Sequence, residues 1–206
     1  SGLPSASQNL NLTEKVDSLV GTPEADVFFS KPGTLQIGDR LNGIGGIDTL
    51  VLEASIHIQN PLSSLSTTIR GIENLAITDL ARLTDMDFSP FTDVKAVSLK
   101  STQTQDRAAI QLRLGHDQSL LLEEIIDGDT GGLSLGDGGL KILQDDASKT
   151  LDLSLKSVGS DEQKRNQSLV IDIAGSQTSV LNLEVSDTSS THIQNSGGSL
   201  STLNIS

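Results

Sequence analysis

Asp17-Ser-Leu19-Val-Gly21-Thr-Pro-Glu-Ala-Asp26-Val-Phe28 is followed by a second stretch with the same frame, Asp39-Arg-Leu41-Asn-Gly43-Ile-Gly-Gly-Ile-Asp48-Thr-Leu50. The leucine, the glycine, the second aspartate and the final apolar residue of the first stretch each recur in the second at one fixed spacing, that from Leu19 to Leu41 (41 − 19 = 22). A fixed period in the twenties is typical of solenoids, in which each repeat forms one coil that stacks on the next. The duplicated frame therefore predicts stacked coils of this length.

The same period recurs further along the chain. The 22-residue spacing also separates Ile72-Glu-Asn-Leu75-Ala-Ile77 from Val94-Lys-Ala-Val97-Ser-Leu99, and Leu181-Asn-Leu183 from Leu203-Asn-Ile205, whereas Leu151-Asp-Leu153-Ser-Leu155 and Leu169-Val-Ile171-Asp-Ile173 are 18 apart (169 − 151). Alternation of aliphatic and polar residues indicates half-buried strands. We therefore expect an all-β chain folded as a parallel β-solenoid with coils of about 18–22 residues. A β-sandwich is the alternative, but the two-residue turns that its hairpins need are few.

The expected organisation is a flexible leader at residues 1–12 and one solenoid domain at 13–206, with the two clear repeats at 13–54. Residues 79–87 and 117–126 could each form either a short helix or a strand with a loop, because short apolar runs are ambiguous by period. The chain begins with Ser1-Gly2 rather than Met, which suggests a segment of a longer protein.

Composition narrows the function classes. The 27 acidic residues exceed the 14 basic ones, giving a net charge of −13, and no basic cluster interrupts the excess, which argues against nucleic acid as a partner. No apolar run is long enough to span a membrane, which takes roughly 18 residues or more, so membrane insertion is not expected. The chain has no cysteine, which excludes disulfides and thiolate metal sites. Four Phe and no Tyr or Trp favour thin aliphatic layers over a core built on rings.

The aspartates and glycines of the repeats form a candidate calcium site. Calcium binds six to eight hard oxygens, from carboxylates and from backbone carbonyls that glycine-rich corners can direct to one point. Stacking of the coils would bring like charges together, which an ion would neutralise. The candidate ligands and corner residues are Asp17, Asp26, Asp39, Asn42, Gly43, Gly46 and Asp48. The alternative is that these aspartates only form Asx-turns at the corners. A second Gly/Asp-rich stretch, residues 127–139, is better interpreted as a plain loop.

The stretch Asn42-Gly43-Ile44-Gly45-Gly46-Ile47-Asp48-Thr49-Leu50 resembles the repeat-in-toxin (RTX) nonapeptide G-G-x-G-x-D-x-(apolar)-x. Gly43, Gly46, Asp48 and Leu50 match that pattern, whereas Ile44 replaces its second glycine. With Gly71-Ile-Glu-Asn-Leu-Ala-Ile-Thr downstream, the chain is also similar to aromatic-poor segments of bacterial surface-layer proteins and type I-secreted adhesins. The resemblance implies an extracellular or cell-surface structural protein that depends on Ca2+.

Other chemistries have less support. His57, His116 and His192 lack metal-ligand spacing, and His116-Asp117 would be a candidate base only with a nucleophile nearby. Polysaccharide-modifying β-helices stack sugars on aromatic rings, and this chain has no Tyr or Trp. We therefore expect no enzymatic activity. The sequence thus predicts a structural or adhesive module whose partners are further copies or neighbouring domains of the same protein. A polysaccharide-binding or polysaccharide-modifying β-helix, acting on cell-surface polysaccharide, is the alternative.

Overall fold

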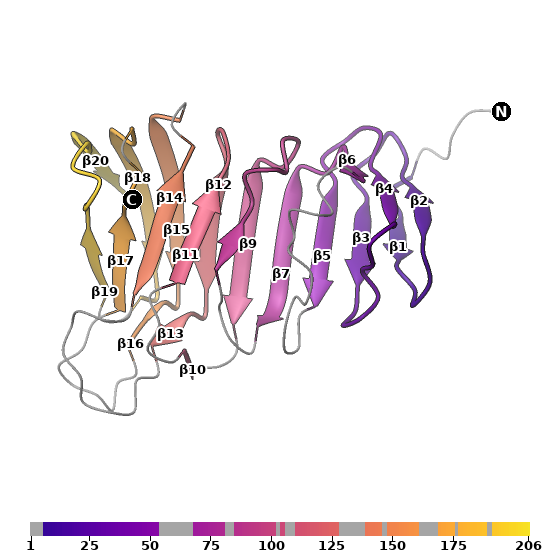
Figure 1. Ribbon diagram of the computed structural model, residues 1–206, viewed down its shortest axis with the longest axis horizontal. Helices are drawn as coiled ribbons and strands as arrows, with labels where there is room; N and C mark the ends of the chain where they lie inside the picture. Colours follow the sequence, from indigo (N-terminus) through magenta and orange to yellow (C-terminus); the bar gives the residue numbers. More distant parts are fainter. Residues whose placement is uncertain are drawn as a thin grey trace.

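The computed structural model describes residues 6–53, 68–80, 85–101, 104–105, 110–127, 139–145, 148–160, 169–175, 177–188 and 191–206. Within these residues all regular structure is β-strand, and every paired strand runs parallel to its neighbour. Figure 1 shows the strands stacked side by side along the long axis, with β1 and β20 at opposite ends of the stack. The fold is therefore all-β with the strand arrangement of a parallel β-solenoid, as predicted, and the hairpin-linked sandwich is wrong for the described strands.

One sheet runs the length of the molecule and contains a strand from every coil. Its nine strands are, in spatial order, β1 (Asn9–Asn11), β3 (Val27–Ser30), β5 (Thr49–Glu53), β7 (Asn74–Leu80), β9 (Ala96–Ser101), β12 (Ser119–Glu123), β15 (Thr150–Lys156), β18 (Val180–Ser186) and β20 (Thr202–Ile205). We call it the long sheet.

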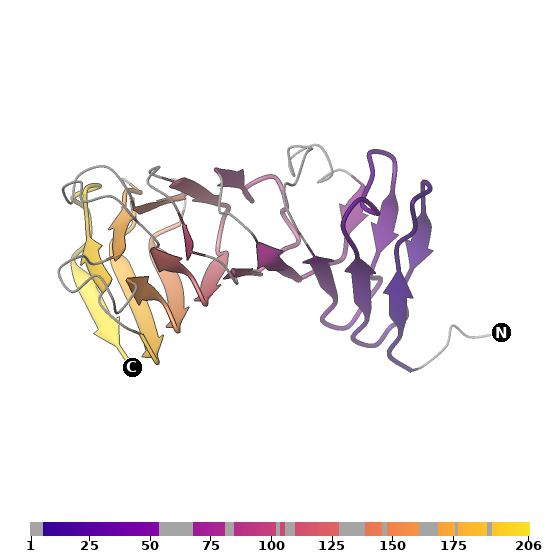
Figure 2. The same ribbon diagram turned by 90° about the horizontal axis from the view of Figure 1, so that it is seen from below.

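Shorter sheets form the other sides of the coils, as the view in Figure 2 shows. Near the N-terminus these strands are β2 (Ser18–Val20), β4 (Arg40–Asn42) and β6 (Ile69–Arg70). Further along the chain they are β8 (Met86–Asp87), β11 (Ile110–Leu114), β14 (Leu140–Gln144), β17 (Leu169–Ile173) and β19 (Thr191–Gln194). A third, narrow sheet contains β10 (Thr104–Gln105), β13 (Ile126–Asp127) and β16 (Gly159–Ser160).

Coil length varies more than the sequence predicts. Phe28 pairs with Leu50 and Leu181 with Leu203, which confirms the 22-residue repeats at both ends of the chain. Between β12 and β15, however, Glu123 pairs with Lys156, at a separation of 33 in the sequence. The described strands between them, at Ile126–Asp127 and Leu140–Gln144, belong to other sheets, so the register of the long sheet is kept while coil length grows.

The similarity between residues 151–155 and 169–173 does not reflect stacking. Leu151 pairs with Leu181 in the long sheet, whereas Leu169 pairs with Thr191 in the five-stranded sheet. Their common alternation reports only that both segments are half-buried strands. An 18-residue coil does occur, but between β1 and β3, where Asn9 pairs with Val27.

Residues 117–126 do not form a helix. They contain β12, a corner at Glu124 with a positive φ of 54°, and the start of β13. Ser157 and Asp187 have φ values of 52° and 48° and follow β15 and β18 as Glu124 follows β12, so left-handed residues stack at one corner. For 79–87, Asp79 and Leu80 end β7 and Met86 and Asp87 form β8, while 81–84 lie outside the described residues.

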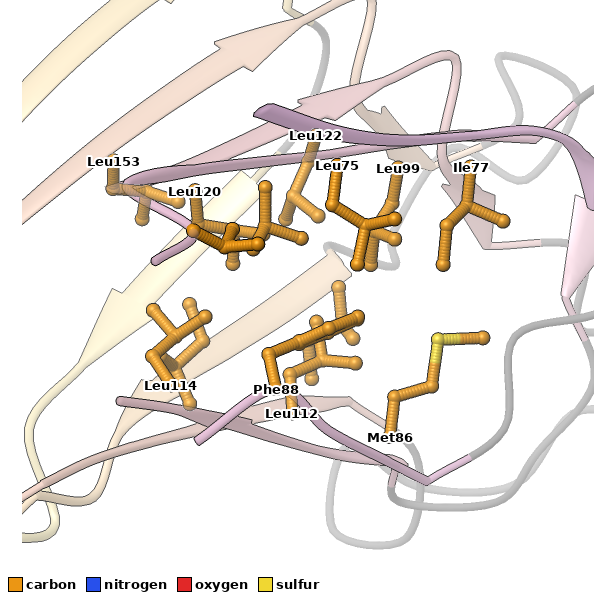
Figure 3. Packing of buried hydrophobic residues seen from close by; sticks show 14 of the residues in the cluster. Leu75, Ile77, Met86, Phe88, Leu99, Leu112, Leu114, Leu120, Leu122 and Leu153 are labelled. Carbon is orange, nitrogen blue, oxygen red and sulfur yellow. The ribbon is translucent and has the colours of Figure 1, made fainter. Parts of the chain in front are cut away.

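The core is a narrow aliphatic layer between the long sheet and the sheet facing it. Figure 3 shows residues of the long sheet, such as Leu99 and Leu120, above Leu112, Leu114 and Phe88 of the opposite side. These side chains are almost fully buried, because alternate residues of each strand point inward. No described segment forms a helix that could cross a membrane.

Candidate functional site

A column of carboxylates lies where the chain enters the first strands of the long sheet. Asp26 precedes β3, Asp48 precedes β5 and Glu73 precedes β7. The N–H of Asp26 donates to Oδ1 of Asp48 at 2.7 Å, and the N–H of Asp48 donates to Oε2 of Glu73 at 2.8 Å. Each carboxylate therefore binds the main chain of the coil before it, and we call this set the carboxylate column.

Asp17 and Asp39 form an equivalent pair at a different corner, before β2 and β4. The N–H of Asp17 donates to Oδ1 of Asp39 at 2.8 Å, and the N–H of Gln36 donates to Oδ2 at 2.7 Å. Asp17 itself accepts the N–H of Thr13 at 2.7 Å. The structure thus brings together Asp17 with Asp39, and Asp26 with Asp48, as the 22-residue period predicts, but at two separate corners.

Asp26 has both carboxylate oxygens satisfied by the chain. Oδ1 accepts the N–H of Gln8 at 2.6 Å, and Oδ2 accepts the N–H of Thr22, whose hydroxyl also donates to Oδ1. Burial acts to raise the pKa of Asp26, but the hydrogen bonds from Thr22 and Gln8 outweigh it and hold the pKa below its ordinary value. This geometry is the Asx-type corner that the sequence leaves as an alternative to calcium.

Asp48 differs from Asp26 in the hydrogen bonding of one carboxylate oxygen. Its side chain is fully buried, yet Oδ2 has no hydrogen-bond partner. The residue equivalent to Thr22 is Ile44, which has no hydroxyl, has a φ of 75°, and donates its N–H to Oδ1 of Asn42 at 3.3 Å instead. Burial, followed by the charges of Asp26 and Glu73, raises the pKa of Asp48 above its ordinary value. In the first repeat the main-chain N–H of Thr22 binds Oδ2 of Asp26, whereas in the second the N–H of Ile44 is directed to Asn42, and this leaves one buried carboxylate oxygen of Asp48 unpaired.

Two acceptor oxygens converge beside Gly43. A Cβ atom at this position would overlap both the carbonyl oxygen of Gly71 and Oδ2 of Asp48. Oδ1 of Asn42 lies close by, 3.6 Å from where a Cβ of Gly71 would be. A carboxylate oxygen and a carbonyl oxygen thus meet at Gly43, where only a residue without a side chain fits, and the amide oxygen of Asn42 lies beside Gly71 of the same corner. We call Asn42, Gly43, Asp48 and Gly71 the Asp48 corner.

Gly71 is a residue of this corner that the sequence-based site did not contain. It contributes a backbone carbonyl from the next coil and has a φ of 59°. Leu19 pairs with Leu41, but Leu41 pairs with Ile69, so the second of these coils is the longer one. Gly71 therefore falls outside the 22-residue frame that identified the other residues. The one signal in the sequence that could have marked it is the glycine itself, because a turn with positive φ favours glycine.

Gly46 is positioned by packing against the preceding coil. It has a φ of 91°, and a Cβ there would collide with the main chain of Glu24 and Ala25. A side chain at this point would push the two repeats apart, which is why the second repeat has glycine where the first has Glu24.

His116 and Asp117 do acquire a serine neighbour. Oγ of Ser148 lies 3.3 Å from Nδ1 of His116, and Nε2 of His116 lies 3.1 Å from Oδ2 of Asp117. Ser148 is only 1% exposed, however, and its Oγ accepts the N–H of Asp117 at 3.0 Å, while the side chains of His116 and Asp117 are largely exposed. In a catalytic triad the serine faces the substrate and the acid that orients the histidine is buried. Here the serine is buried and the acid is exposed, so the arrangement does not fit a triad. It closes a turn between two coils.

The remaining candidate residues from the sequence give less evidence of a site. His192 is exposed on β19, and both His57 and most of the 127–139 stretch lie outside the described residues. In the described part of the chain, no group of three or more His, Asp or Glu side chains is arranged to hold a metal. Oxygens at the Asp48 corner come mostly from the main chain and from an amide, which such a grouping does not include.

Comparisons with protein-family models, with curated proteins and with solved structures gave no significant match.

Proposed function

We propose that the chain is a non-enzymatic structural module of a secreted or cell-surface protein, stabilised by calcium at the Asp48 corner. A continuous stack of parallel strands is a stiff rod in which each coil contacts only its neighbours, and such rods serve to space or present other surfaces. The acidic surface and the near absence of aromatic rings favour this role over recognition of nucleic acid or sugars.

The observation that carries the calcium proposal is the unpaired Oδ2 of Asp48. A buried ionised carboxylate oxygen without a donor is costly, because water has been removed and nothing replaces it. Asp48 Oδ2, the carbonyl of Gly71 and Oδ1 of Asn42 are hard oxygens of the three kinds that calcium combines. When bound, the ion would supply the positive charge that this carboxylate lacks.

The other aspartates stabilise the stacking of the coils and are not proposed as calcium ligands. Asp26 and Asp39 each accept a main-chain N–H from the preceding coil and so align the first coils, while Asp17 accepts an N–H within its own turn. Secretion would then couple folding to the high calcium concentration outside the cell, since an ion that binds only the folded chain adds its binding free energy to stability.

A thermal melt in excess EGTA and in millimolar calcium tests the proposal. At a calcium concentration 100-fold above Kd the gain is about 2.7 kcal/mol. For a chain of this size that corresponds to a rise in Tm of roughly 5–10 °C. Magnesium, which demands a rigid octahedral shell, should have a smaller effect. Identical melts in EGTA and calcium would refute calcium-coupled folding.

A further inference from the structure

The main-chain N–H groups of three corner glycines each bind the coil that follows. The N–H of Gly21 donates to a carbonyl oxygen of β4 at 2.8 Å, and the N–H of Gly43 donates to a carbonyl oxygen of β6 at 3.0 Å. The N–H of Gly71 donates instead to a side chain, Oδ2 of Asp93, at 2.9 Å. An exposed carboxylate thus takes the place that a strand carbonyl has in the two earlier coils.

Asp93 has this role because the sheet of β2, β4 and β6 ends beside it. Within the described residues, β6 pairs only with β4, and residues 88–93 are not in a strand. In the long sheet Leu75 pairs with Val97, so Asp93 lies one 22-residue coil after Gly71. Asp93 therefore occupies the corner position of the next coil, and its carboxylate accepts the N–H that a further strand would otherwise bind.

The peptide group between Arg70 and Gly71 is held from both sides. Its carbonyl oxygen accepts the N–H of Gly43 from the preceding coil, and its N–H donates to Asp93 of the following coil. Gly71 has a φ of 59°, and Ile72, which is 1% exposed, anchors the next peptide in the core. Together these contacts set the direction in which the carbonyl of Gly71 points.

That carbonyl oxygen meets the unpaired oxygen of Asp48 beside Gly43, where a Cβ would overlap both. A glycine moves between positive and negative φ at little cost, so the residue type alone does not hold the turn at Gly71. Loss of the hydrogen bond to Asp93 would leave the turn free to rotate. One of the proposed calcium ligands would then point away from the corner.

We propose that Asp93 is the positioning residue of the Asp48 corner, because it fixes the turn at Gly71 and so directs the Gly71 carbonyl toward Oδ2 of Asp48. Its effect on calcium rests on the proposed function, whereas its hold on the turn does not. Asp93 acts through the glycine, since its Oδ2 accepts the Gly71 N–H and its side chain is exposed, while Asp48 is fully buried. The corner is thereby coupled to a coil that supplies none of the proposed ligands.

Calorimetric titration of calcium into the wild type and its variants tests the effect on the cation. Asp93→Ala should weaken calcium binding about 10–100-fold, the range for groups that orient a metal ligand without touching the metal. Asp93→Asn should stay within about fivefold of the wild type, because its amide oxygen can still accept the Gly71 N–H and the charge of an exposed side chain is screened.

Asp85→Ala is the matched control. Asp85 is also exposed, and its Oδ1 accepts the main-chain N–H of Gln111 in the next coil at 2.8 Å, but this bond belongs to the five-stranded sheet. The variant loses the same charge and the same kind of hydrogen bond as Asp93→Ala. It should bind calcium as the wild type does.

Amide hydrogen exchange in EGTA tests the turn without calcium. The Gly71 amide should exchange at least about tenfold faster in Asp93→Ala than in the wild type, because its bond to a charged acceptor is lost. It should stay protected in Asp93→Asn. In Asp85→Ala the amide of Gln111 should be released instead, and that of Gly71 should be unchanged.

The outcomes separate this inference from the proposed function. Calcium binding by Asp93→Ala that equals the wild type, or Gly71 exchange that ignores the substitution, would overturn the inference and leave the calcium site standing. Equal losses of affinity in Asp93→Ala and Asp93→Asn would show that only the charge matters, which also contradicts it. A wild type that binds no calcium while Gly71 exchange still depends on Asp93 would refute the calcium site and support the placement of the turn by Asp93.

Discussion

The main-chain N–H of Asp26 donates to Oδ1 of Asp48, the residue at the same position of the next coil, across 2.7 Å. A carboxylate at the same position of successive N-terminal coils thus supplies one of the hydrogen bonds between those coils. Charge-assisted bonds of this kind are stronger than those between neutral groups. They explain how acidic residues can be buried at the corners of an acidic protein.

Replacement of Asp26 by Asn should destabilise the chain. Both oxygens of Asp26 accept main-chain N–H groups, so an amide nitrogen must face one of these donors. The expected loss is about 1.5–3 kcal/mol, the range for hydrogen bonds to charged groups. Urea unfolding measures it, with Glu24→Gln, an exposed acid of the same turn, as a control that should change stability by less than about 0.5 kcal/mol. Equal losses for both variants would contradict the carboxylate column.

Gly43→Ala and Gly45→Ala should differ sharply although the two positions are close in the sequence. A Cβ at Gly43 meets the carbonyl of Gly71 and Oδ2 of Asp48, whereas the nearest atom to a Cβ at Gly45 is 3.6 Å away. We expect a cost of about 1–3 kcal/mol or more for Gly43→Ala, as for other overpacked sites. Gly45→Ala should be near neutral. Chemical denaturation of both variants decides the matter, and similar costs would show that Gly43 is not confined.

Neighbouring leucines of β12 test which face of the long sheet is the core. Leu122 is fully buried, while Leu121 points outward and is only half-buried. Leu122→Ala should cost about 2–5 kcal/mol. Leu121→Ala should cost clearly less, because its cavity opens to solvent. If the order were reversed in urea unfolding, the strand would have the opposite register.

The sequence predicts the fold well where the repeats keep their length. The 22-residue spacing identified the pairs Phe28–Leu50 and Asp26–Asp48 because an identical coil length puts equivalent residues in register. It failed for Leu151 and Leu169, since alternation says that a strand is half-buried and not to which sheet it belongs. The carbonyl of Gly71 was missed because its coil is longer than 22 residues, so the glycine, the one signal in the sequence, falls outside the repeat frame.

The pH dependence of Asp26 and Asp48 should have opposite signs. The pKa of Asp26 is lowered by folding, so its contribution is present above the unfolded-state pKa of about 3.9 and lost as pH falls through the folded value. The pKa of Asp48 is raised, so its contribution is present below about 3.9 and lost as pH rises through the folded value.

Unfolding free energies of Asp26→Asn and Asp48→Asn, measured in EGTA from neutral to acidic pH, check this. The cost of Asp26→Asn should shrink as the wild-type carboxylate protonates. At neutral pH Asp48→Asn should instead be more stable than the wild type, and this gain should vanish in acid. Parallel pH profiles for the two variants would contradict the assigned shifts.

The central claim is that Oδ2 of Asp48 needs a cation, and the melting of Asp48→Asn beside the wild type in EGTA and in calcium tests it most directly. An asparagine can keep Oδ1 on the N–H of Asp26 and turn Nδ2 toward the carbonyl of Gly71, which satisfies the corner without an ion. The account predicts that calcium raises the Tm of the wild type by several degrees, while the variant melts above the wild type in EGTA and does not respond to calcium. A wild type that ignores calcium, or a variant that responds to it as the wild type does, would contradict the account.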